Sequence, residues 1–178
     1  MITWQSAVCR AAVACKLPGM KMDSELARMA WQLVDECKVG LLTTADKDGW
    51  PHATWMNFQN KGYLDEIFTI TAPNTLKVAN LRANPRTEWM FSHPNFNAES
   101  IVYVTGETHI IEGDAVQPWW DAMPGKSAAF FRRYCESNDF RKFVALVTKV
   151  TNVACCCPIA YRKSAVLDAV AVRKKEGP

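Results

Sequence analysis

The sequence lacks any uninterrupted apolar run of about 20 residues, the length that a transmembrane helix requires. We therefore expect no membrane partner. The chain also lacks a marked excess of one charge, because 21 Lys and Arg stand against 18 Asp and Glu for a net charge of +3. A charge this small does not point to nucleic acid, and we expect no nucleic-acid partner.

Sites built from cysteine and histidine are not indicated either. No Cys-x-x-Cys pair occurs, and the three histidines, His52, His93 and His109, do not supply matched spacings, so no metal site is predicted. The seven cysteines are odd in number, and Cys155 to Cys157 are consecutive. No simple disulfide framework fits that pattern. We interpret the cysteines as reduced thiols of a cytoplasmic protein, and the role of the consecutive three stays open.

The chain has no internal repeat, low-complexity linker, Walker-type loop or Gly-x-Ser-x-Gly motif. Its 178 residues suit one domain. We place that single domain at residues 23–178, behind an N-terminal extension of residues 1–22. Arg10 interrupts the apolar start of the extension and no basic segment precedes it, so it makes a poor signal peptide. An alternative is that the natural start codon is Met20 or Met22.

The first predicted elements are an amphipathic helix and a β-hairpin. Asp23 and Ser24 are good N-cap residues for the helix. Apolar residues then recur at helical spacing along one face: Leu26, Met29, Ala30, Leu33, Val34 and Cys37. Strands are predicted at Val39 to Ala45 and at Trp50 to Phe58. The turn between them, Asp46 to Gly49, ends in an Asp-Gly pair that readily supplies the positive φ of a tight hairpin.

The middle of the chain is predicted to form a turn, a strand and a helix. Gln59 to Gly62 is the turn, and Ile67 to Thr71 is a β-branched strand. Pro73 and Asn74 open the helix, and Asn84-Pro85 ends it because the residue before proline is pushed out of the helical region. One face of this helix carries three apolar residues, Leu76, Ala79 and Ala83.

Three further strands and one helix complete the prediction. The strands are Arg86 to Ser92, Ile101 to Ile111, and Phe143 to Val150 with a continuation toward Cys157; the helix is Ala128 to Tyr134. Gly106 marks a bulge or bend in the long strand. The fold class is therefore mainly β with flanking helices. A small antiparallel barrel is favoured because closing a sheet removes its exposed edges.

The segment from Thr71 to Lys77 is the main indication of a ligand. A strand that ends where a helix begins leaves backbone N–H groups pointing outward, and these suit a phosphate. Thr75 can add a hydroxyl donor and Lys77 a full positive charge. The alternatives are an ordinary first-turn threonine and a solvated lysine. Further along, Trp119 and Trp120 are adjacent, so we expect one of them to face a partner or a ligand.

Three blocks of sequence, in their order and spacing, resemble the FMN-binding split-barrel proteins, which include pyridoxamine 5'-phosphate oxidase and the general stress protein group. The first block is Asp48 to Met56, with the sequence DGWPHATWM. The second contains the strand Phe68 to Thr71, then Thr75, Lys77 and Asn84-Pro85. The third is Val102 to Glu107, VYVTGE. The resemblance covers residues 25–111 well and the rest loosely.

This resemblance implies a homodimer with two FMN molecules, each in a groove between protomers. Thr54, Trp55 and Met56 would line the isoalloxazine or the ribityl chain, although Trp55 and Met56 could instead be core or interface residues. Thr71 would lie near the ribityl phosphate. Thr75 and Lys77 would hold that phosphate, with Leu76 between them as a further cofactor-binding residue. Trp119 or Trp120 of the second protomer would stack over the flavin.

The chain departs from the family pattern at two of these positions. Many relatives carry arginine where this chain has Thr54, and proline often stands in place of Trp55. Losing the arginine removes a bidentate phosphate contact, so weaker FMN binding is expected. The Arg-Leu-His-Asp-Arg segment of true pyridoxamine phosphate oxidases is also missing near the C-terminus. The chain is therefore placed nearer the general stress group.

Three functions stay open at the level of sequence. The leading one is an FMN-dependent oxidoreductase with an unidentified small-molecule substrate, its electrons coming from a donor such as a reduced nicotinamide. No catalytic residue is identified, because His52 is suggested only by its residue type. The second is a non-catalytic stress or sensor module that binds FMN, a deazaflavin or haem. The third is a dimeric scaffold with an empty site.

Overall fold

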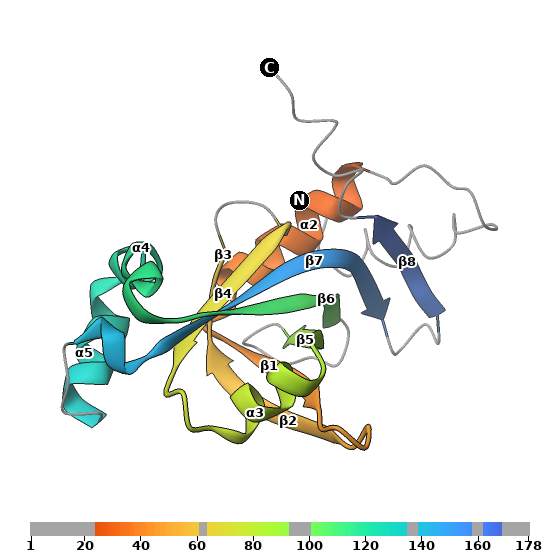
Figure 1. Cartoon of the computed structure of the whole chain (residues 1–178). Helices are drawn as coiled ribbons and strands as arrows, with labels where there is room; N and C mark the ends of the chain where they lie inside the picture. Colours follow the sequence, from red (N-terminus) through yellow and green to blue (C-terminus); the bar gives the residue numbers. More distant parts are fainter. Residues whose placement is uncertain (1–23, 61–63, 93–100, 135–138, 158–161, 169–178) are drawn as a thin grey trace.

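A computed structural model describes residues 24–60, 64–92, 101–134, 139–157 and 162–168, and its main feature is one eight-stranded antiparallel sheet (Figure 1). Along the sheet the order is β2-β1-β5-β6-β7-β4-β3, and β8 pairs with β7. The strands are β1 (Val39–Ala45), β2 (Pro51–Asn57), β3 (Gln59–Asn60), β4 (Glu66–Thr71), β5 (Arg86–Ser92), β6 (Ile101–Ile111), β7 (Val144–Cys157) and β8 (Arg162–Asp168). The prediction of a mainly β, antiparallel fold is confirmed.

Short helices flank this sheet. They are α2 (Ser24–Glu36), α3 (Leu76–Ala83), α4 (Gln117–Asp121) and α5 (Gly125–Tyr134), with 3-10 turns η1 (Gly113–Val116) and η2 (Phe140–Lys142). Figure 1 shows α4 and α5 together where β6 ends and β7 begins, and α3 packs against β1 and β6. None of the helices in the described segments is long and apolar enough to cross a membrane.

The sheet curls until its two ends meet. β2 and β3 lie at opposite ends of the strand order, yet a single residue, Phe58, separates them along the chain. Such a connection requires the sheet to fold back on itself. Across the seam the hydroxyl of Thr69, on β4, donates to the carbonyl of Asn57 at 2.5 Å. The result is a split β-barrel, as the sequence predicts.

Two apolar clusters stabilise the barrel. The larger one fills the interior and includes Trp89 and Phe91, both fully buried. The smaller one lies between β4, β7 and the helices α4 and α5, and it includes Phe68, Phe131 and Phe143. All six residues of β4 are buried, because one face of the strand meets each cluster.

The predicted bulge at Gly106 is confirmed. The register between β6 and β7 shifts between Thr105 and Gly106. A Cβ atom on Gly106 would lie inside contact distance of the Lys149 carbonyl oxygen and 2.9 Å from its carbonyl carbon. Close approach of the β7 backbone therefore explains why glycine stands at this position.

Three local predictions are wrong. Gln59 and Asn60 form β3 rather than part of a turn, because they pair with Phe68 and Ile67. α3 begins at Leu76 with Thr75 at its N-cap, so Pro73 and Asn74 precede the helix. Its buried face is also different from the one predicted. Leu76, Ala79 and Ala83 are exposed, whereas Val78, Asn80 and Leu81 are buried.

The remaining elements agree more closely with the sequence. α5 begins at Gly125, three residues before the predicted start, and β7 runs to Cys157. β8 has no counterpart in the prediction. Cys155 to Cys157 lie on β7, where a register shift against β8 between Cys155 and Cys156 interrupts a regular alternation. The predicted extension at residues 1–22 lies outside the described residues.

Candidate functional site

A groove of about 510 Å³ opens where the barrel seam meets the start of α3. Pockets of about 300–1,000 Å³ commonly hold small molecules and cofactors. The lining comes mainly from β2 and β4, with residues from the start of β1, from β3, from the first turn of α3 and the segment before it, and from α5 and the segment before it. It consists of Val39, Thr54, Trp55, Met56, Asn57, Phe58, Gln59, Phe68, Thr69, Ile70, Thr71, Ala72, Lys77, Met123, Phe130 and Phe131. Most of this surface is apolar, and Lys77 is the one charged residue among the lining residues that the structure describes.

The structure brings five of the predicted cofactor-binding residues to this groove. Thr54, Trp55 and Met56 line it from β2, and Thr71 and Lys77 line it from the end of β4 and the first turn of α3. β2 is the end strand of the sheet order, so it is paired on one side with β1. Trp55 is 60% exposed, which leaves its ring at the open side of the groove.

Lys77 is the electrostatic centre of the groove. Its Nζ lies 3.5 Å from the Thr71 hydroxyl, and burial lowers the pKa of the ammonium because the charged form loses solvation. Within the described residues, no carboxylate lies within ion-pair distance of Lys77. A partly buried cation without a counter-ion favours binding of an anionic ligand.

The start of α3 adds hydrogen-bond donors beside this cation. The first N–H groups that bond within the helix belong to Val78 and Ala79, which both donate to the Thr75 carbonyl. The N–H groups of Leu76 and Lys77 come earlier in the chain and have no carbonyl partner within the helix, as expected for a first turn. Unbonded N–H groups at the start of a helix suit an anion.

Three other predicted residues do not line the groove. The hydroxyl of Thr75 donates to the Ala72 carbonyl at 3.2 Å and makes no capping bond. Leu76 is 58% exposed. Trp119 packs edge-on against Phe68, with ring centroids 5.1 Å apart, so it lies behind the groove wall. Cofactor contacts from these three residues stay a prediction.

The adjacent tryptophans both pack against the smaller cluster. Trp120 stacks on Phe143 at 5.3 Å between centroids, and it also contacts Phe131 at 5.5 Å. Both indoles are half-buried. These contacts show that both tryptophans hold α4 on the barrel. The expectation that one of them also faces a partner or a ligand stays a prediction.

Sequence reasoning missed the aromatic wall of the groove. Phe130 and Phe131 come from α5, about 60 residues after the strand that they face, and no local pattern places them there. The sequence predicts Phe68 and Ile70 as strand residues and indicates no ligand role for them. Two adjacent phenylalanines on a short helix are the one local indication of this wall, but such a pair fits packing in a core equally well.

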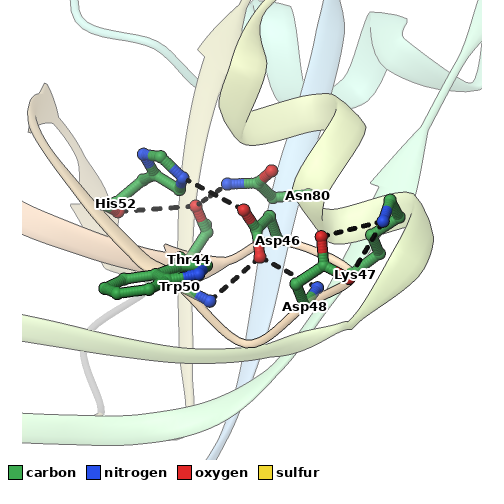
Figure 2. A network of polar contacts seen from close by, with 7 residues as sticks. All are labelled: Thr44, Asp46, Lys47, Asp48, Trp50, His52 and Asn80. Atoms are coloured by element: carbon green, nitrogen blue, oxygen red, sulfur yellow. Dashed lines mark hydrogen bonds and ion pairs between the residues drawn. The ribbon is translucent and has the colours of Figure 1, made fainter.

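Figure 2 shows a polar network near the β1–β2 hairpin, and none of the residues in it lines the groove. One Asp46 oxygen accepts the N–H groups of Asp48 and Trp50, both at 2.9 Å, and the other lies 3.6 Å from His52 Nε2. These contacts lower the pKa of Asp46, the Trp50 N–H most strongly. His52 thus faces the hairpin turn and does not line the groove.

The network continues into the interior. The side-chain amide of Asn80, on α3, donates to Thr44 on β1, and Thr44 donates to the carbonyl of His52. Among the described residues no group of three or more His, Cys, Asp or Glu side chains is arranged to hold a metal ion.

Comparison with known proteins agrees with this split-barrel class. Residues 29–157 of the 178 match the family model described as "Pyridoxamine 5'-phosphate oxidase". The chain therefore belongs to the pyridoxamine 5'-phosphate oxidase family, whose members generally bind a flavin and are commonly dimers. No curated protein matches the sequence.

Several solved structures share the fold. General Stress Protein 26 from Bacillus anthracis str. Sterne is 16% identical, with a TM-score of 0.63 over 81% of this chain and 98% of that one. A protein from Clostridium acetobutylicum related to general stress protein 26 is 18% identical, with a TM-score of 0.63 over 82% and 94%. A heme binding protein from Mycobacterium smegmatis is 19% identical, with a TM-score of 0.67 over 87% and 62%. Identities this low show the fold alone.

Proposed function

We propose that this chain binds FMN in the groove beside Lys77 and works as an FMN-dependent oxidoreductase of a small molecule. A single split-barrel domain over residues 23–178, in a homodimer, would carry the site. The observation that supports this most is the partly buried ammonium of Lys77 in an apolar groove, with no carboxylate of the described residues within ion-pair distance. Family membership supports flavin binding in general.

The residues present fit the chemistry of FMN. The cofactor has an anionic phosphate at one end and a flat aromatic ring at the other. Lys77, the Thr71 hydroxyl and the free N–H groups at the start of α3 suit the phosphate. Met56 and Phe131 are among the apolar side chains that line the groove and suit the ring.

FMN, when bound, would supply the redox chemistry. The chain's own residues would bind and orient it. Lys77 would anchor the phosphate, and Thr54 and Asn57 would offer a hydroxyl and an amide along β2. The apolar wall of Phe130 and Phe131 would exclude water from the ring. A reduced nicotinamide is the electron donor that we propose.

The homodimer is supported by apolar side chains at the rim of the groove. Val39 is 43% exposed, Trp55 60% and Phe130 45%, and all three line the groove. Large apolar side chains gathered at one place commonly mark an interface. A second protomer over this rim would cover them and close the groove.

One observation favours a second function, a non-catalytic flavin- or haem-binding module. Among the lining residues that the structure describes there is no carboxylate, imidazole or thiol, so the groove offers no group of the usual kind for proton transfer. One structural neighbour is described as a heme binding protein. Oxidation of NADH or NADPH with an added acceptor separates the two functions. A rate well above that of free FMN supports the enzyme, and a rate equal to it supports the module.

Replacement of Lys77 tests the cofactor site itself. If Lys77 binds the phosphate, Lys77→Ala should weaken FMN binding by about 2 kcal/mol, the scale of a lost charged hydrogen bond. Arg82→Ala is the matched control, because Arg82 is an exposed cation on the same helix, paired with Glu112 at 2.7 Å and outside the groove. Fluorescence titration with FMN gives both affinities. Equal affinity of wild type and Lys77→Ala would exclude the phosphate role.

A wild-type protein that does not bind FMN at all would instead favour an empty scaffold. Thr54, which stands where many relatives carry arginine, would then be the first residue to replace. Thr54→Arg should restore FMN binding in that case, since arginine offers two parallel donors to a phosphate.

A further inference from the structure

A buried hydrogen bond joins α3 to the β1–β2 hairpin (Figure 2). Asn80 Nδ2 donates to Thr44 Oγ1 at 3.1 Å, and the Thr44 hydroxyl donates to the His52 carbonyl at 3.5 Å. Asn80 is 3% exposed and Thr44 is 2% exposed. Buried polar groups cost free energy unless they are hydrogen-bonded, so each of these side chains depends on the other.

Neither residue lines the groove, yet each belongs to an element that forms one side of it. Asn80 follows Lys77 by three residues on α3, close to one helical turn. Thr44 pairs with His52 on β2, two residues before Thr54. The Asn80–Thr44 hydrogen bond therefore connects α3, which carries Lys77, with β1, and the Thr44–His52 bond extends this link to β2, which carries Thr54.

Apolar packing alone does not fix α3 in one position. Val78 and Leu81 anchor the helix in the larger cluster and are almost fully buried. Contacts of this kind are non-directional, so they tolerate small shifts of the helix. A hydrogen bond has a defined distance and direction. An apolar side chain at position 80 could be buried without any hydrogen-bond partner. The amide found there therefore indicates that Asn80 fixes the position of α3 and does more than fill space.

We propose that the Asn80–Thr44 hydrogen bond is a positioning contact that sets where Lys77 lies relative to β2, and thereby lets the groove prefer a phosphate-bearing flavin over one without phosphate. This inference rests on the proposed function of the groove. Asn80 and Thr44 act through Lys77 and do not touch the ligand. The contact thus gives the site part of its selectivity from one helical turn beyond Lys77.

The test compares the affinities of FMN and riboflavin, which share the ring and differ by the phosphate. Thr44→Val keeps the shape of the side chain and removes the hydroxyl. We expect the preference for FMN over riboflavin to fall about three- to tenfold in this variant, the scale of one hydrogen bond, with riboflavin affinity nearly unchanged. Thr44→Ser keeps a hydroxyl and should retain the preference.

Two further variants separate positioning from loss of stability. Thr87→Val removes a buried hydroxyl that bonds to Thr108 at 2.8 Å, and Thr87 does not line the groove. This variant should lower the melting temperature without changing the ratio of the two affinities. Asn80→Ala breaks the same contact as Thr44→Val from the other side and should lower the ratio to a similar degree. It also provides the test if Thr44→Val does not fold.

Each outcome identifies which proposal fails. In one outcome, the wild type prefers FMN and Lys77→Ala loses that preference, but Thr44→Val and Asn80→Ala both keep it. This outcome overturns the positioning role alone. Equal loss of FMN and riboflavin affinity in those two variants also overturns it, because general loosening would act on both ligands. A wild type that binds FMN and riboflavin equally overturns the phosphate site and the positioning role together.

Discussion

The indole N–H of Trp89 donates to the hydroxyl of Thr148 at 3.0 Å, with both side chains fully buried in the barrel. Thr148 in turn bonds to Thr108 at 2.7 Å, and Thr108 bonds to Thr87 at 2.8 Å. A chain of three hydroxyls thus crosses β7, β6 and β5 inside the core. It gives the indole N–H of Trp89, the largest fully buried side chain among the described residues, a hydrogen-bond partner. Without a partner, that buried N–H would cost free energy.

Removing the acceptor of that bond should be strongly destabilising. Thr148→Val keeps the volume but leaves the Trp89 N–H buried without a partner, so we expect a loss of about 2–3 kcal/mol in the free energy of unfolding. Denaturant unfolding measures it. Trp89→Phe in the same background removes the donor as well, so the double variant should lose less stability than the sum of the losses in the two single variants. Strictly additive losses would show that the Trp89–Thr148 hydrogen bond does not stabilise the barrel.

The bulge between β6 and β7 gives a second prediction. Gly106→Ala would bring a methyl group against the Lys149 carbonyl, so the strands must separate locally. Overpacking of this kind costs about 1–3 kcal/mol, and contact with backbone, which cannot rotate away, favours the upper end. Gly125→Ala is the matched control, since nothing lies within 4 Å of the added atom. Similar melting temperatures for the two variants would show that the sheet yields at Gly106.

Lys77 should make the stability of the cofactor-free protein depend on pH. Burial lowers its pKa below the usual value of 10.5, so the folded chain releases this proton at a lower pH than the unfolded chain does. Between those two values the unfolded state holds more protons, and the free energy of unfolding rises with pH. Below that window both states are protonated, and the cost of a partly buried charge is present in full.

The neutral variant Lys77→Met isolates this contribution. It should be more stable than the wild type near neutral pH, and the difference should shrink as the pH rises toward 10.5. Denaturant unfolding of both proteins at a series of pH values gives the comparison. A difference that stays constant or grows over that range would show that the Lys77 ammonium is not desolvated in the folded chain.

The strand limits could be predicted because local residues mark them. The turn from Asp46 to Gly49 and the Asn84-Pro85 stop both lie where the sequence places them, since turn chemistry and the restriction before proline act over a few residues. β3 could not be predicted in this way. Two residues become a strand there only because the curled sheet brings Phe68 beside them.

The candidate site was partly predictable for a related reason. Thr71 and Lys77 stand at a strand-to-helix junction, which is a local feature with a known affinity for phosphate. The wall formed by Phe130 and Phe131 depends on how α5 packs on the barrel, and a sequence does not show tertiary packing of that kind. The buried face of α3 was mispredicted because Asn80 is polar, and its partner Thr44 lies 36 residues away.

Whether the groove holds FMN is tested by the visible absorption spectrum of the freshly purified protein, with the released chromophore identified after denaturation. We expect the bands of an oxidised flavin and the release of FMN. A haem band would contradict the proposed cofactor while leaving the fold intact. A colourless protein that also fails to bind added FMN would contradict the claim that the groove beside Lys77 is a flavin site.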